Sequence, residues 1–186
     1  AILVTAWQNL WPLTALPMIH SPHMTVLPNV DASGALKLTE WAAANGVAPD
    51  QFVDLGLVPN EDMPDLLKEF DLAVFPNRCE GGTNLVAMET MACGVPSIIA
   101  ANTGQLDLIG DSNCYSLTDQ RPVDTPDGGV ADWGETSVEE LLEHMEHAYQ
   151  NRDEARRRGQ AAADFMRDWS WSGQIGKLLD TLEEFC

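Results

Sequence analysis

Apolar and polar positions divide the first two-thirds of the chain into two kinds of segment. Short apolar runs, typical of buried strands, occupy residues 2–7, 24–28, 51–58, 71–76 and 96–101, and residues 113–117 form a sixth candidate. They are mostly continuous rather than alternating, as expected for strands that are covered on both faces of a sheet. Helical patterns lie between them at residues 35–45, 61–70 and 84–93.

Helix-boundary residues support these assignments. Asn60 is a suitable N-cap for the second helix, and Gly94 with Pro96 is a typical stop for the third. Strands that alternate with helices over short links predict a parallel sheet covered by helices. We therefore expect an α/β fold, with a Rossmann-like parallel sheet and helices on both of its faces.

The last third of the chain has a different pattern. Residues 118–135 are rich in Pro, Gly and Asp and predict a surface loop. Thr136 with Glu139, and Asn151 with Glu154, have the spacing of capping boxes, which predict helices to about residues 150 and 167. Residues 170–185 predict a terminal helix, so residues 136–186 should form C-terminal helices.

Size and charge narrow the class of protein. With 186 residues and 45% hydrophobic composition, residues 1–186 are expected to form a single domain. A formal charge of −19 argues against binding to nucleic acid or to anionic membranes. No apolar run reaches the roughly 20 residues of a spanning helix, so no integral membrane segment is expected.

The cysteines and the first residues add two expectations. The four cysteines form no CxxC pair and have no spacing suited to zinc, which favours a reduced, cytoplasmic protein. The chain opens in strand-like sequence without a methionine. This start suggests a piece of a longer protein.

Candidate chemistry is concentrated in the loop after the strand at 71–76. In open parallel sheets, ligands bind beyond the carboxyl ends of the strands. Gly81 and Gly82 are expected to admit a ligand close to the backbone and to adopt positive φ, and Thr83 or Asn84 is expected to cap the next helix. A helix N-terminus preceded by glycines suits a phosphate, although an ordinary turn has the same composition.

Glu89 is the unusual residue of the helix that follows. It lies roughly 7 Å along the axis from Asn84, among mainly apolar neighbours. A buried carboxylate needs a partner. The partner could be Arg78, or Glu89 could lie on a narrow exposed stripe, or it could accept hydrogen bonds from the ribose of a nucleotide whose phosphates bind at the helix start. Together with the glycine turn, the third interpretation is favoured.

The segment "FPNRCEGGTNLVAMETMACGVPSIIAANTG" at residues 75–104 resembles the donor-binding signature of retaining GT-B glycosyltransferases of the family 4 group. The shared pattern is a glutamate, a glycine-rich turn, a helix with a second glutamate, a Gly-x-Pro stop and a glycine loop. "WSW" at 169–171 is similar to another element of that family, so the resemblance extends over residues 51–186. Eight residues separate Glu80 from Glu89, one more than the family's usual number.

The resemblance implies a role for each residue of the site. Glu89 would hold the ribose, Glu80 would be the catalytic-site carboxylate near the transferred sugar, and the loop after the strand at 51–58 would flank the nucleobase. The usual basic pair for the diphosphate is not evident, and Arg78 or Lys37 could replace it. The donor-binding residues implied in this way are Gly81, Gly82, Thr83, Asn84, Glu89, Arg78, Val58 and Pro59.

The implied activity is transfer of a hexosyl group from an NDP-sugar with retention of configuration. No metal or other cofactor is expected. The chain would be the donor-binding half of a GT-B fold, inactive alone, because the N-terminal domain that binds an acceptor of unknown kind would be absent. The alternatives are a sugar-nucleotide epimerase or a phosphorylase of the same fold, or a non-catalytic module that binds a nucleotide or a protein.

Overall fold

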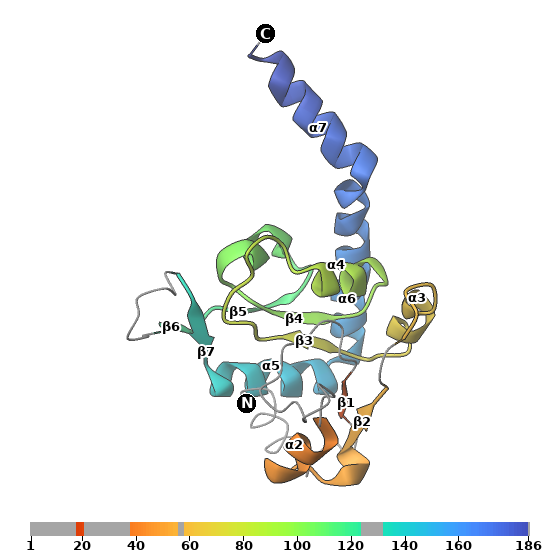
Figure 1. The fold of residues 1–186 in the computed structure, drawn as a ribbon, viewed down its shortest axis with the longest axis vertical. Helices are drawn as coiled ribbons and strands as arrows, with labels where there is room; N and C mark the ends of the chain where they lie inside the picture. The colour runs from red at the N-terminus through yellow and green to blue at the C-terminus, as the bar shows by residue number, and fades with distance from the viewer. Residues whose placement is uncertain (1–17, 21–37, 56–57, 124–131, 186) are drawn as a thin grey trace, which may run out of the picture.

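A three-stranded parallel sheet lies at the centre of the computed structural model, which describes residues 18–20, 38–55, 58–123 and 132–185 (Figure 1). Its strands are β3 (Ala73–Phe75), β4 (Ser97–Ala100) and β5 (Tyr115–Leu117), in the order β3–β4–β5. Both pairings are parallel. The strands predicted at 71–76, 96–101 and 113–117 are therefore confirmed.

A separate parallel pair joins β1 (Met18–His20) to β2 (Phe52–Asp54). Strand β2 falls within the predicted strand at 51–58, whereas no strand was predicted at β1. The strands predicted at 2–7 and 24–28 lie outside the described residues. Helix α2 (Leu38–Ala44) falls within the predicted helix at 35–45, and α3 (Met63–Leu67) within that at 61–70.

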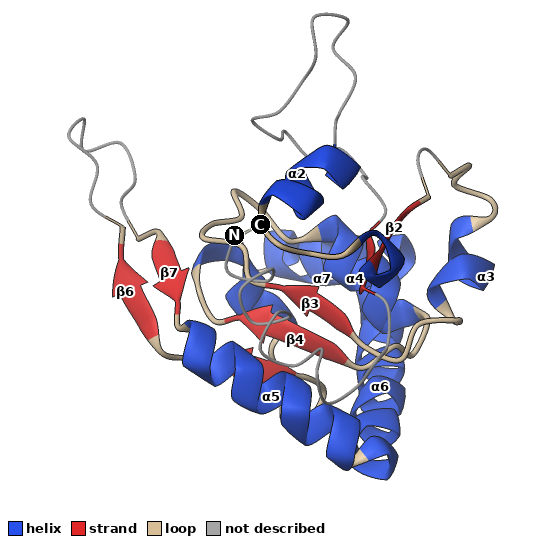
Figure 2. Cartoon of the chain, turned by 90° about the horizontal axis from the view of Figure 1, so that it is seen from below, coloured by secondary structure: helices blue, strands red, loops and turns tan. Residues whose placement is uncertain are grey.

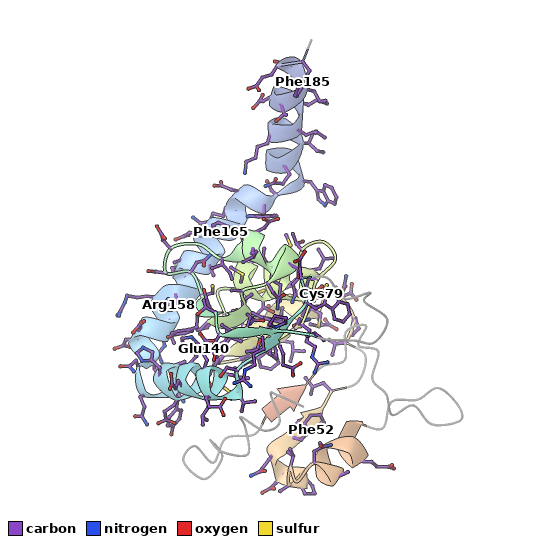
Figure 3. The ribbon with its side chains drawn as sticks, turned by 90° about the vertical axis from the view of Figure 1, so that its left-hand side faces the viewer. Phe52, Cys79, Glu140, Arg158, Phe165 and Phe185 are labelled. Atoms are coloured by element: carbon purple, nitrogen blue, oxygen red, sulfur yellow. The ribbon has the colours of Figure 1, made fainter. Side chains whose placement is uncertain are left out.

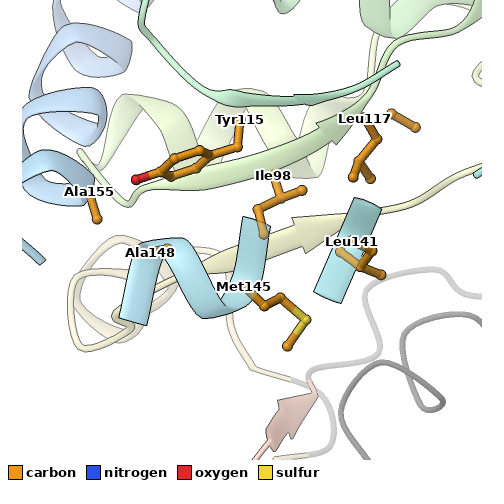
Figure 4. Packing of buried hydrophobic residues seen from close by; sticks show 8 residues of the cluster. Ile98, Tyr115, Leu117, Leu141, Met145, Ala148 and Ala155 are labelled. Atoms are coloured by element: carbon orange, nitrogen blue, oxygen red, sulfur yellow. The ribbon is translucent and has the colours of Figure 1, made fainter. Parts of the chain in front are cut away.

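Helices cover both faces of the central sheet (Figure 2). On one face, Ile98 of β4 packs with Tyr115 and with Leu141 and Met145 of α5 (Val138–Gln150) (Figure 4). On the other face, the next residue of β4, Ile99, packs against α4 (Leu85–Ala92) and α6 (Arg152–Met166). Successive side chains of a strand point to opposite faces, so the continuous apolar run of β4 serves two cores.

The segment 118–135 is only partly a loop. Within it, β6 (Gln120–Pro122) pairs in antiparallel register with β7 (Gly134–Thr136), which extends one residue beyond the segment. The prediction of a surface loop was wrong for both ends of this segment, because its Pro- and Gly-rich composition gives no sign of pairing between ends separated in sequence.

Both predicted capping boxes were wrong. Helix α5 is capped by Ser137, whose hydroxyl accepts a hydrogen bond from the N–H of Glu140, while Thr136 belongs to β7. Asn151 donates its side-chain amide to the carbonyl of His147 at 2.9 Å. Its side chain therefore closes the last turn of α5, while its carbonyl, at the N-cap position of α6, accepts from the N–H of Ala155 at 3.0 Å.

The C-terminal helices otherwise agree with the pattern of the sequence. Helix α7 (Trp171–Glu183) begins after Ser170, which caps it, and extends away from the central sheet (Figure 1). Short 3₁₀ turns occupy Pro49–Gln51, Thr103–Leu108 and Arg167–Trp169. Among the helices that the structure describes, none combines the length and the apolar character needed to cross a bilayer.

Acid is expected to weaken the junction between α5 and α6 through Glu154. Hydrogen bonds from His147 at 2.9 Å and from Arg158 hold the pKa of this carboxyl below its ordinary value of 4.5. A lowered folded-state pKa adds stability above pH 4.5 that is lost as the pH falls through the folded-state value. In urea melts between pH 6 and pH 3, Glu154→Gln should lose less stability on acidification than the wild type, whereas Glu183→Gln on exposed α7 should follow the wild type. If the unfolding free energies of all three proteins fell equally with pH, this role of Glu154 would be contradicted.

Candidate functional site

The candidate site lies where the loops that leave β3 and β4 meet. Because these strands are parallel, their exits lie at the same edge of the sheet. The N–H of Glu80 donates to the hydroxyl of Thr103 at 2.8 Å, and the N–H of Gly104 donates to the carbonyl of Glu80 at 3.2 Å. In Figure 3, Cys79 marks the first of these loops, well away from Arg158 of α6.

The two loops approach so closely that one position requires glycine. A Cβ atom at Gly104 would overlap the backbone carbonyl of Gly82. The other side of the turn is open, since a Cβ at Gly81 or Gly82 would meet nothing within 4 Å. The glycine turn is thus supported from behind by the β4 loop and leaves space in front.

The prediction of positive φ at Gly81 and Gly82 was wrong. Among the described glycines, positive φ occurs at Gly46 and at Gly94, which ends α4 as predicted. The absence of a side chain in front of the turn, rather than an unusual backbone conformation, is what these two glycines provide.

Helix α4 begins directly after this turn, with Asn84 as its N-cap. The Asn84 side-chain oxygen accepts from the N–H of Ala87 at 3.0 Å, which selects Asn84 over Thr83 as the cap. Six successive backbone N–H groups, those of residues 81–86, have no hydrogen-bond partner among the described residues. The first turn of α4 contains no acidic residue. Free N–H groups at the positive end of a helix dipole favour an anion such as a phosphate.

A buried amide network fixes these loops. Gln105 accepts from Asn84 at 3.1 Å and donates to the carbonyl of Asn77 at 3.4 Å. Asn102 donates to the same carbonyl at 2.9 Å and to Gln120 of β6 at 3.1 Å. Asn84, Asn102 and Gln105 are buried. The network thus connects the glycine turn, the loop after β4 and strand β6. The sequence does not reveal this network, because its members are far apart along the chain.

Removing Gln105 is expected to loosen this assembly. Gln105 is fully buried, and alanine there would leave the Asn84 amide without its acceptor as well as a cavity. The expected loss is about 2–4 kcal/mol of unfolding free energy. Chemical denaturation should show this loss for Gln105→Ala and almost none for Leu106→Ala, whose side chain is exposed. Equal midpoints for the two variants would show that the network does not stabilise the fold.

Glu89 lies one turn before Cys93 on α4, so the two side chains lie on the same side of the helix. The Glu89 side chain is half-buried and has no hydrogen bond or ion pair within the part of the chain that the structure describes. Cys93, one turn further along the same face, packs on a small core of Met63, Leu67 and Val95, and Val58 packs on the same core. Glu89 is therefore an unpaired carboxylate on the same side of α4 as Cys93, which packs on one core with Val58.

Arg78 is engaged elsewhere. Its guanidinium forms an ion pair with Glu135 of β7, and its carbonyl accepts from the N–H of Gly134 at 2.9 Å. A salt bridge between Arg78 and Glu89, one of the alternatives considered from the sequence, is therefore wrong. The contacts of Arg78 thus link the loop after β3 to strand β7. Lys37 lies outside the described residues.

Val58 and Pro59 mainly support the local structure beside α3. The Val58 side chain is partly buried against the small core beside α3. Pro59 is exposed, and its carbonyl accepts from the N–H of Asp62 at 3.0 Å. Hence only the exposed Pro59 presents its side chain fully to solvent.

Glu80 is half-buried and is oriented by Asn77. The Asn77 amide donates to the Oε1 atom of Glu80 at 2.6 Å. Burial raises the pKa of the Glu80 carboxyl above 4.5, and the hydrogen bond from Asn77 partly opposes that rise. In the described parts of the chain, no three His, Cys, Asp or Glu side chains come together in a group able to hold a metal ion.

Solved structures share this fold. HepE of Anabaena in complex with UDP is 17% identical, with a TM-score of 0.66 over 97% of this chain and 44% of that one. Sucrose-phosphate synthase of Thermosynechococcus elongatus is 18% identical, with a TM-score of 0.69 over 100% of this chain and 42% of that one. The chain thus spans less than half the length of either.

A third similar structure is itself a domain. It is the C-terminal domain of a glycosyl transferase group 1 family protein, LpcC, of Francisella tularensis, 15% identical with a TM-score of 0.60 over 88% of this chain and 74% of that one. These neighbours establish the α/β fold of one GT-B half. No curated protein matches the sequence.

The sequence itself identifies the family. Residues 10–126, more than half of the chain, match the profile of a family described as glycosyl transferases group 1. The matched range includes the glycine turn, helix α4 and the β4 loop. The chain therefore belongs to the glycosyl transferases group 1 family.

Proposed function

We propose that this chain is the donor-binding domain of a retaining glycosyltransferase of the family 4 group, which moves a hexosyl group from an NDP-sugar to an acceptor. The observation that carries the proposal is the open N-terminus of α4, with its free backbone N–H groups and with Glu89 unpaired further along the same helix. HepE of Anabaena was solved with UDP and with UDP-glucose, which supports a nucleotide-sugar as the ligand.

The geometry suggests how a donor would be held. The diphosphate would accept hydrogen bonds from the N–H groups of Gly81, Gly82 and Thr83 and from the start of α4, capped by Asn84. The ribose hydroxyls would donate to Glu89, and the nucleobase would lie against Val58 and Pro59. As the glycosidic bond breaks, negative charge grows on the leaving diphosphate, and preorganised N–H donors with the helix dipole stabilise that charge.

In this proposal Arg78 contributes little to binding of the diphosphate, and no metal ion is required. Arg78 is paired with Glu135, so recognition of the diphosphate would depend chiefly on neutral backbone groups. No metal is proposed, because the helix terminus supplies the charge stabilisation. The acceptor would bind to a further domain, and this chain alone would bind the donor without turnover.

Isothermal titration of the chain with UDP, GDP and ADP tests the proposal. At least one of them should bind, and the corresponding nucleoside, which lacks the diphosphate, should bind far more weakly. Failure of all three nucleotides to bind at millimolar concentration would rule the proposed function out.

A further inference from the structure

Glu80 is held at three points by the residues around it. Its N–H donates to Thr103 at 2.8 Å, its carbonyl accepts from Gly104 at 3.2 Å, and its Oε1 atom accepts from the Asn77 amide at 2.6 Å. The two backbone contacts fix the position of the residue, and the third fixes the orientation of the carboxylate.

Asn77 performs two separable tasks. Its backbone carbonyl accepts from Asn102 and from Gln105, so the main chain is tied into the buried amide network. Its side chain has one hydrogen bond among the described residues, the bond to Glu80. A change of the Asn77 side chain therefore releases the carboxylate without removing either backbone contact of the network.

The second oxygen of Glu80 is left available. Oε2 has no hydrogen-bond partner among the described residues, yet it is not among the buried unsatisfied atoms, so it reaches solvent. Glu80 directly precedes Gly81 and Gly82, the open part of the turn. A fixed carboxylate with one oxygen free beside an open turn is arranged to accept a hydrogen bond from a ligand hydroxyl.

We propose that Asn77 is a positioning residue: it holds Oε1 of Glu80 so that Oε2 faces a hydroxyl of the donor's sugar. The inference rests on the proposed function, because the sugar is the ligand that Glu80 would meet. A hydrogen bond donated to the ionised carboxylate also favours that form, which is the one that accepts from a hydroxyl. The energetic benefit arises because orientation is fixed before the ligand binds.

The titration of Glu80 tests this role without any ligand. Carboxyl carbon resonances of ¹³C-labelled glutamate, assigned with Glu80→Gln, would be followed against pH in the wild type, Asn77→Ala and Asn77→Asp. Burial already raises the pKa of Glu80, and Asn77 is the opposing influence. The pKa should rise in Asn77→Ala and rise further in Asn77→Asp, which keeps the shape but adds a like charge and removes the donor. Asn60→Ala, at an exposed turn, is the control.

Affinity for the donor provides the second readout. UDP and UDP-glucose would be titrated into the wild type and Asn77→Ala. The variant should lose about tenfold in affinity for UDP-glucose, as expected for one charge-assisted hydrogen bond, and keep its affinity for UDP. An unchanged Glu80 pKa, or equal losses for both ligands, would overturn the positioning role. Failure of the wild type to bind either ligand would instead count against the proposed function, while the pH titration would still decide the role of Asn77.

Discussion

Gly159→Ala is expected to destabilise the domain by about 1–3 kcal/mol, because α6 crosses the end of α4 at this residue with no room for a methyl group. A Cβ at Gly159 would overlap the carbonyl oxygen of Gly94 and lie 3.0 Å from the backbone nitrogen of Pro96. Both neighbours are backbone atoms at the turn between α4 and β4, so neither can move aside cheaply. Thermal unfolding should show a midpoint lowered by several degrees.

The chain contains a matched control for this change. Gly176 is also in a helix interior, but a Cβ there would meet nothing within 4 Å. Alanine is the better helix former by up to about 1 kcal/mol, so Gly176→Ala should leave stability unchanged or raise it. If the two variants unfold at the same temperature, the close contact between α6 and α4 does not require glycine at position 159.

Glu89→Ala is expected to weaken binding of the nucleotide about 10- to 100-fold. The magnitude follows from losing hydrogen bonds between a carboxylate and ribose hydroxyls, at about 1.5–3 kcal/mol. Inorganic pyrophosphate has no ribose and should bind the variant at least as well as the wild type. Glu143→Ala, exposed on α5, is the control for loss of one negative charge.

A change of ligand makes the test of Glu89 specific. The wild type should prefer UDP to 2′,3′-dideoxy-UDP, and Glu89→Ala should bind the two equally, since the contact that distinguishes them is gone. Calorimetric titration of both ligands into both proteins measures the coupling. If the variant keeps the preference of the wild type, Glu89 does not hold the ribose.

The segment from β3 to β4 could be predicted well from the sequence because its signals are local. Asn84 caps α4 with its own side chain, Gly94 ends it, and the apolar runs of β3 and β4 flank it. The family-like motif coincides with these elements, so residue pattern and fold agree there. The open glycine turn and its helix follow from the same few residues.

Long-range contacts could not be predicted in the same way. The pairing of Gln120 with Thr136 has no nearby signal, and Pro122 at a strand end argues against a strand when read alone. Likewise Gln105 meets Asn84 only because two parallel strands end side by side. The N-cap of α5 is Ser137 rather than the predicted Thr136, because Thr136 belongs to β7. Tertiary pairing therefore overrode a local motif.

The central claim is that the N-terminus of α4 and the glycine turn before it bind the diphosphate of a nucleotide. Two-dimensional ¹H–¹⁵N spectra recorded during addition of UDP, GDP or ADP are the appropriate test. The backbone amides that are proposed to bind the diphosphate are the groups whose signals these spectra record. We expect the largest shifts at residues 81–86, whose N–H groups have no partner in the described structure. Shifts confined to other parts of the chain, or no shifts with any of the three nucleotides, would contradict it.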